Sequence, residues 1–236
     1  MLDLIGTIAT VGLVAILAGL LAGATSLSSR ARMAAFVGVG VWLGVLVAAG
    51  ALGWFATGVT GPVPTVGIAL FAVLAVGLIA YFRVPRFRER LLRIPLPVLI
   101  AANIGRVVGV FFLILYGVHR LPAPFAPSAG WGDVITGVLA LPLAAMAASG
   151  SARPIWIGLW NAFGMLDLLV AITLGVLSVP GTPLNLLAVG PSATTLLTLP
   201  WVLVPSFLVP AYLLMHLLIF RQLRAPRAVS TAALAA

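Results

Sequence analysis

Two ionisable residues, Arg106 and Asp167, lie inside long apolar stretches of this sequence. A charged side chain near the middle of a membrane-spanning helix costs about 2.5–3.5 kcal/mol on insertion scales, so such residues pair or meet water. A guanidinium can bind an anion or pair with a carboxylate, and a buried carboxylate can accept a proton or a cation. The two residues therefore predict a site for a small anionic or polar molecule or a proton, or else an ion pair that only fixes helix register.

Other polar residues fall on faces that could meet this pair. On a helix that turns about 100° per residue, Asn103, Arg106 and Val110 share one face. Asn161 lies about as deep in its own stretch as Asn103 does, and Tyr212 lies one turn from His216. We predict a ligand-binding site, in the cytoplasmic half of the membrane, made of Arg106, Asp167, Asn103, Asn161, Tyr212 and His216.

The residue types exclude several kinds of chemistry. There is no Cys, which excludes disulfides, thiolate metal sites and iron–sulfur clusters. There is no Lys for a retinal Schiff base. The only two His residues, His119 and His216, are predicted near opposite membrane surfaces, which disfavours a haem held by both. The motifs HExxH, GxSxG and GxxxxGK[ST] are absent. We therefore expect no enzymatic activity, no cofactor and no metal.

The elements that carry these residues follow from composition. Of 236 residues, 63% are apolar and 7% charged, against roughly 45–50% and 25% in soluble domains. A spanning helix needs about 20 mostly apolar residues. The sequence predicts an all-α bundle of seven transmembrane helices in a single domain, 1–236, that ends in a short cytoplasmic tail, 221–236. The predicted spans are about 4–24, 34–56, 65–82, 97–118, 133–148, 155–178 and 197–220.

The arginines predict how this bundle sits in the membrane. All of them except Arg106 and Arg120 follow the first, third, fifth or seventh span. Because basic residues in short loops stay on the cytoplasmic side, the amino terminus should lie outside and the carboxyl terminus in the cytoplasm. The start, Met1-Leu2-Asp3, lacks the basic residues of a secretory signal, so the first span should be retained.

The connection 85–94, PRFRERLLRI, allows two interpretations. It is a basic loop that only sets topology, or a short interfacial helix on anionic lipid, with Phe87, Leu91 and Ile94 at i, i+4 and i+7 and arginines between them. The arginines are spread along an apolar chain, so no nucleic-acid partner is expected. The expected partners are the lipid bilayer, anionic lipid headgroups, a small-molecule ligand, and a second copy of the chain or a membrane complex.

Small residues and prolines predict how the helices pack. Pairs of glycines four residues apart let helix backbones approach closely, either within the chain or between copies. On the last span, Pro200, Pro205 and Pro210 should kink the helix and make it the moving part. The glycine pairs are Gly19 and Gly23, Gly40 and Gly44, and Gly105 and Gly109.

A second polar zone lies toward the predicted outer surface. Asp133 should cap the amino terminus of the fifth span, and Trp131 should sit in the interfacial aromatic belt. Alternatively, Asp133 forms an outer site or gate with His119 and Arg120.

The strings LPAPFAPSAGWGD and WNAFGMLDLLVA resemble segments of uncharacterised bacterial multi-pass membrane proteins, over about 120–175. This resemblance implies a multi-pass protein of the bacterial cytoplasmic (inner) membrane and brings no functional residues with it. The sequence thus predicts a membrane protein that binds or transports a small polar or anionic molecule or a proton through a cavity between helices. The alternative is a non-catalytic accessory or assembly subunit of a membrane complex.

Overall fold

The computed structural model describes the chain except residues 26, 56–64, 181–183, 188–191 and 225–236. The described residues form helices and connections without a strand, and seven of the helical segments are long and apolar enough to cross a membrane. The predicted all-α, seven-span architecture is confirmed. The seven segments are α1 (Leu2–Ala24), α2 (Ser29–Ala51), α3 (Thr65–Arg83), the composite Leu96–Gly117, α7 (Phe125–Ala148), α8 (Pro154–Leu177) and Val204–Arg224.

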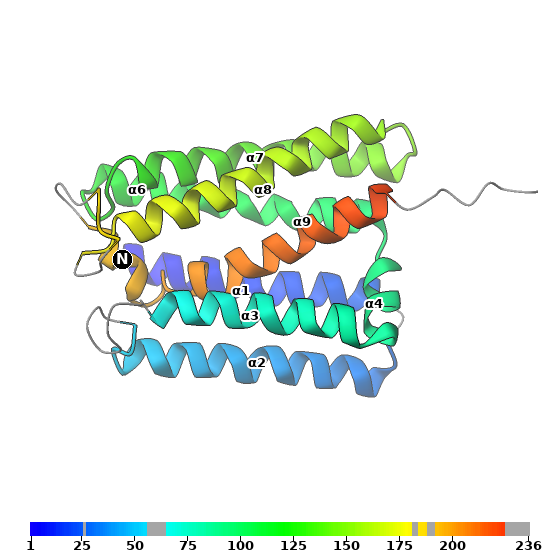
Figure 1. Cartoon of the computed structure of the whole chain (residues 1–236), viewed down its shortest axis with the longest axis horizontal. Coiled ribbons are helices and arrows are strands. Elements are labelled where there is room, and N and C mark those ends of the chain that lie inside the picture. The colour runs from blue at the N-terminus through cyan, green and yellow to red at the C-terminus, as the bar shows by residue number, and fades with distance from the viewer. Residues whose placement is uncertain (26, 56–64, 181–183, 188–191, 225–236) are drawn as a thin grey trace, which may run out of the picture.

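The long helices run side by side in Figure 1, and one short helix lies across their ends. This is α4 (Pro85–Leu92), which contacts the ends of α3 and α9 (Val209–Arg224). Residues 85–92 are therefore helical, as the second interpretation expected, but Ile94 lies beyond the helix and is buried in the core. Pro85 occupies the first helical position, where the backbone N–H that proline lacks would have no acceptor within the helix.

Two helices begin earlier than predicted. The α2 helix starts at Ser29 because the Ser28 hydroxyl accepts a hydrogen bond from Ala31 N at 3.3 Å, so Arg30 lies in its first turn. The α7 helix starts at Phe125 rather than at 133. Pro127 is tolerated in its first turn, where backbone N–H groups have no helical partner. The prediction that Asp133 caps this helix is therefore wrong, because Asp133 lies inside it.

The fourth span changes its helical period at its centre. It consists of α5 (Leu96–Ala102), a 3₁₀ helix (Asn103–Gly109) and α6 (Val110–Gly117). A 3₁₀ helix has three residues per turn, so every third side chain points the same way. The buried residues follow that period, while Val110 is 41% exposed, which corrects the face predicted from 100° steps. They are Asn103, Arg106, Gly109, Phe112 and Leu115.

The last span is interrupted where its prolines lie. A 3₁₀ turn (Ala193–Leu197) and a π-helical turn (Val204–Leu208) precede α9, which becomes regular at Val209. Pro205 removes a backbone donor and crowds the preceding turn, which favours the wider π turn. The predicted span 197–220 starts too early, and the helix continues to Arg224, so 221–224 are not part of a tail. Residues 225–236 of the predicted tail lie outside the described residues.

The predicted glycine pairs divide into two kinds. A Cβ on Gly105 would lie 2.3 Å from Leu13 Cδ1, and one on Gly109 would lie 2.2 Å from Asp133 Cβ. These two glycines therefore allow helices of this chain to approach closely. A Cβ on any glycine of the other two pairs, in α1 and α2, would meet no atom within 4 Å among the described residues, so these glycines make no close helix contact there.

Candidate functional site

The centre of the bundle holds a fully buried arginine with two carboxylates. Arg106 Nε donates to Asp133 Oδ1 at 2.7 Å, and Arg106 Nη2 donates to Asp167 Oδ2. Its Nη1 donates to Gly164 O at 2.9 Å and to His216 Nε2 at 3.1 Å. Arginine has five N–H donors in a planar fork, so most of them are used within the chain. One side chain thus ties the fourth span to α7, α8 and α9.

The ring of His216 has a definite protonation state in this arrangement. Because a guanidinium N–H can only donate, Nε2 must be the acceptor, and the ring hydrogen lies on Nδ1. Nδ1 then donates to Asn161 Oδ1 at 2.7 Å, and Asn161 Nδ2 donates to the His216 carbonyl at 3.0 Å. His216 is therefore a neutral imidazole, held by two bonds to α8 and one to Arg106.

The charges of this cluster do not cancel. Arg106 carries one positive charge, Asp133 and Asp167 carry two negative charges when both are ionised, and His216 is neutral. An uncompensated charge is costly in a medium of low dielectric constant. A single proton on one of the two carboxyl groups would make the cluster neutral. We define these four residues as the Arg106 cluster.

Glycines bring the surrounding helices close enough to form the Arg106 cluster. A Cβ on Gly132 would lie 1.6 Å from Asp167 Oδ1, and one on Gly164 would lie 2.8 Å from His216 Cε1 and 3.0 Å from Arg106 Nη1. Side chains larger than hydrogen would therefore displace the charged groups. On α8, Trp160 donates from Nε1 to Thr136 O at 3.0 Å and packs against His216.

Several buried polar atoms lie on the elements of the cluster without a hydrogen-bond partner among the described residues. They include Tyr212 Oη, Asn103 Oδ1 and Thr136 Oγ1. The Tyr212 ring lies under the guanidinium, with its centroid 5.9 Å from Arg106 Cζ, a cation–π distance. Asn103 Nδ2 donates to Leu99 O in its own helix at 3.0 Å. Buried polar atoms of this kind are usually satisfied by ordered water.

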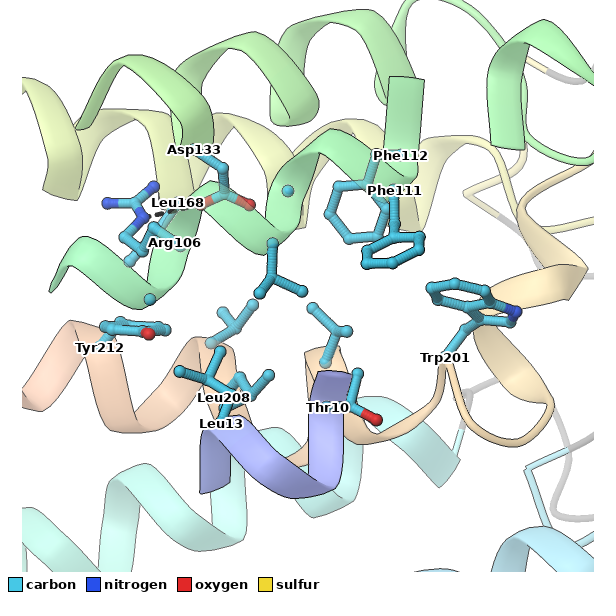
Figure 2. Close-up of a pocket in the computed structure, with 15 residues that line it drawn as sticks. Thr10, Leu13, Arg106, Phe111, Phe112, Asp133, Leu168, Trp201, Leu208 and Tyr212 are labelled. Carbon is cyan, nitrogen blue, oxygen red and sulfur yellow. Dashed lines mark hydrogen bonds and ion pairs between the residues drawn. The ribbon is translucent and has the colours of Figure 1, made fainter. Parts of the chain in front are cut away.

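A cavity of about 30 Å³ adjoins the cluster. Figure 2 shows it between Arg106 and Asp133 on one side and Trp201 on the other, with Thr10 and Phe111 along its length. A water molecule needs roughly 10–15 Å³ of such volume, so about two waters fit. Pockets for drug-sized ligands measure roughly 300–1,000 Å³. The cavity thus suits water and not a metabolite.

Beyond Trp201 lies a second, exposed ion pair. Arg120 Nη1 lies 2.9 Å from Asp3 Oδ1, which also accepts a hydrogen bond from Trp201 Nε1 at 2.7 Å. The alternative prediction that groups Asp133 with Arg120 and His119 is therefore wrong, because Arg120 pairs with Asp3. Trp131 is 58% exposed on the outside of the bundle.

The structure joins most of the residues that the sequence singled out. Direct contacts link Arg106 to Asp167, His216 and Tyr212, and link Asn161 to His216. Asn103 is buried on the same 3₁₀ helix but makes no hydrogen bond to the others within the described part of the chain. The residue that sequence reasoning missed is Asp133. The sequence signal for Asp133 is the run of small residues before it, because such runs occur in closely packed helices as well as in loops. Whether these residues bind a ligand stays a prediction.

Among the described residues, no group of three or more His, Asp or Glu side chains is placed to hold a metal ion.

Seven apolar helices around a buried charged cluster define a multi-pass membrane protein. The chain belongs to the family described as "Domain of unknown function (DUF8737)", which matches residues 63–224. No curated protein and no solved structure matches the chain. The matched range contains the whole Arg106 cluster, whereas α1 and α2 precede it.

Proposed function

We propose that this protein binds an exchangeable proton at the Arg106 cluster and conducts protons between the two sides of the membrane. The observation that carries the proposal is that two carboxylates, the buried Asp167 and the part-buried Asp133, share the buried Arg106 guanidinium within the spanning helices. One carboxyl group can take up a proton and release it while the other keeps Arg106 paired. Intramembrane carboxylates next to a histidine are the usual components of proton relays.

The geometry of the Arg106 cluster favours a proton over a larger anion as the ligand. Arg106 already faces two carboxylates, so an approaching anion would meet no net positive charge. The adjoining cavity holds about two waters and has no room for a small organic molecule. Of the ligands predicted from the sequence, the proton is the one that fits both the charge and the volume.

The proton route that we propose runs through this cavity. From Asp133 it passes water near Thr10 and Tyr212 and reaches Trp201, which separates the cavity from the Asp3–Arg120 pair. On the other side of Arg106, Nε2 of the neutral His216 is the next proton acceptor. The bonds between His216 and Asn161 close on the His216 carbonyl, so the proposed route continues from His216 through water. Trp201 precedes the π turn at Val204–Leu208, so a change in that turn would move the ring and open the route.

For orientation, we propose an outside amino terminus and a cytoplasmic carboxyl terminus in a bacterial inner membrane. The short helix α4, the start of α2 and the end of α9 lie at one end of the bundle in Figure 1, opposite the amino terminus. The arginines of these segments therefore gather on one side, as the positive-inside rule expects for the cytoplasmic side. With this orientation Trp201 and Asp3 lie on the outer side of the cavity.

Proton flux in proteoliposomes tests the proposal. A potassium gradient with valinomycin supplies the driving force, and a pH-sensitive dye inside the vesicles reports the flux. We expect wild-type flux above that of protein-free vesicles, and its loss in Asp133→Asn and in Asp167→Asn. Glu89→Gln is the matched control, because it makes the same chemical change on the short helix α4, outside the cluster and the proposed route, and it should keep the wild-type flux. Wild-type flux equal to that of empty vesicles, or equal in all variants, would refute the proposal.

One observation favours a second candidate, a non-catalytic accessory or assembly subunit. Most N–H donors of Arg106 are satisfied within the chain, and glycines allow the neighbouring helices to pack closely against it. These features are expected of a buried ion pair that only fixes helix register. Under this hypothesis, replacing Arg106, Asp133 and Asp167 together by Leu removes the cost of burying charge and keeps the fold. A triple variant that folds and keeps its partner, with a wild type that conducts no protons, would favour this candidate.

A further inference from the structure

An apolar groove lies at the arginine-rich end of the bundle, away from the Arg106 cluster. It runs between α3 and α9 under the short helix α4 and measures about 280 Å³. Its apolar walls include Leu78, Tyr81 and Phe82 of α3 and Phe87 and Leu91 of α4. From Ala211 to Arg221, the outermost lining residues of α9, it extends about 15 Å along the helix.

The groove is held in shape by close contacts. A Cβ on Gly77 would lie 2.6 Å from Leu214 Cδ1, so α3 and α9 touch at this point along the groove. Gln222 Nε2 donates to Leu92 O at 3.2 Å and to Ile94 O at 2.8 Å, which fastens the end of α4 to α9. These contacts therefore fix the positions of α3, α4 and α9 around the groove.

The open end of the groove is strongly basic. Arg221 is the one charged residue in its lining, and it is exposed to the surroundings. On α4, Arg86 and Arg90 flank the row of Phe87 and Leu91 that covers the groove. Glu89 is the one acid near them in the sequence, and none of these arginines forms an ion pair within the described part of the chain. Unpaired guanidinium groups are thus available for an anion.

We propose that this groove binds an anionic phospholipid, with one acyl chain between α3 and α9 and the headgroup phosphate at Arg221. Arginine pairs with phosphate through a fork of N–H donors, and basic pockets between spanning helices are suited to anionic headgroups. A partner helix, about 10 Å across, is too wide for a groove of this volume. The single apolar channel with a cationic mouth matches the amphipathic shape of a lipid. This proposal does not rest on the proposed proton site.

Native mass spectrometry of the full chain tests the lipid site. The protein is released from nanodiscs that contain equal amounts of phosphatidylglycerol and phosphatidylcholine, and the retained lipids are counted. We expect the wild type to retain phosphatidylglycerol, and Arg221→Gln to reduce that preference about fivefold, the effect of one surface arginine on an anionic lipid. Arg224→Gln is the matched control, because this arginine is equally exposed on the same helix end but does not line the groove.

A second variant tests the acyl chain, and the folding of all variants is checked by size-exclusion chromatography. Leu78→Trp fills the groove and should abolish retention of phosphatidylglycerol, whereas soluble glycerol phosphate should not displace the lipid from the wild type. Equal losses in Arg221→Gln and Arg224→Gln would show only diffuse attraction to basic surface and would overturn the proposal. Retention in Leu78→Trp, or displacement by glycerol phosphate, would overturn it as well.

Discussion

The chain contains the same chemical pair, arginine with aspartate, in two different surroundings. In the Arg106 cluster, the side chains of Arg106 and its partners Asp133 and Asp167 are 0%, 16% and 7% exposed. In the pair of Arg120 with Asp3, the side chains are 36% and 52% exposed. The first has one carboxylate in excess and glycines packed against it, while the second has one carboxylate that also accepts a bond from Trp201.

The difference in burial and in charge balance distinguishes the Arg106 cluster, which affects both stability and protonation, from an ion pair at the surface. Breaking a buried pair leaves an uncompensated charge and costs about 3–5 kcal/mol, whereas an exposed pair contributes about 0–1 kcal/mol. The excess carboxylate also gives the buried cluster a group that can change its protonation state. The exposed pair has matched charges and no such group. The following variants test this contrast, from the largest expected effect to the smallest.

Replacing Arg106 by Leu should have the largest effect. It leaves Asp133 and Asp167 buried without a cation, and we expect a loss of about 3–5 kcal/mol in the free energy of unfolding. Unfolding in detergent, followed by circular dichroism, measures this change. The matched control is Arg120→Leu. Equal destabilisation by the two variants would remove the distinction between the two pairs.

Replacing Gly132 by Ala should have the next largest effect. The added Cβ would lie 1.6 Å from Asp167 Oδ1, so the Asp167 carboxyl must shift away from Arg106 or the two helices must move apart, and such overpacking costs about 1–3 kcal/mol. The same substitution at Gly40, where nothing lies within 4 Å among the described residues, should be neutral or slightly stabilising. Thermal unfolding of both variants compares them, and a tolerated Gly132→Ala would contradict the close packing around the cluster.

Replacing Asn161 by Leu tests the link between α8 and α9. The change leaves His216 Nδ1–H without its acceptor and removes the additional bond to the His216 carbonyl, and a buried unsatisfied group costs about 1–3 kcal/mol. We expect destabilisation in that range in thermal unfolding. A more stable Asn161→Leu would mean that His216 makes no essential contact there.

The smallest effect is expected for Arg120→Gln. The exposed pair with Asp3 should contribute less than about 1 kcal/mol, and its contribution should fall further as the salt concentration rises. Unfolding measured at low and at high ionic strength gives both values. A salt-independent loss of several kcal/mol would place Arg120 in the same class as Arg106.

The sequence predicted the bundle well and the cluster in part. Long apolar stretches sufficed for seven spans, and the cost of burying charge singled out Arg106 and Asp167 and offered their ion pair as one alternative. Asp133 was missed because a run of Pro, Gly and Ser before it also describes a loop. The 3₁₀ turn at Asn103–Gly109 changed which residues share a face with Arg106, and no local pattern marks such a change of period. The Gly164 carbonyl could not be found, since a backbone acceptor has no signal in side-chain types.

The central claim is that the Arg106 cluster holds one exchangeable proton on a carboxyl group. Infrared spectroscopy of the protein in lipid, in H₂O and in D₂O, detects the C=O stretch of a protonated carboxyl directly. The claim predicts such a band near neutral pH, a shift of the band in D₂O, and its loss in Asp133→Asn or Asp167→Asn but not in Asp3→Asn. No protonated carboxyl at neutral pH, or a band that persists in both cluster variants, would contradict it.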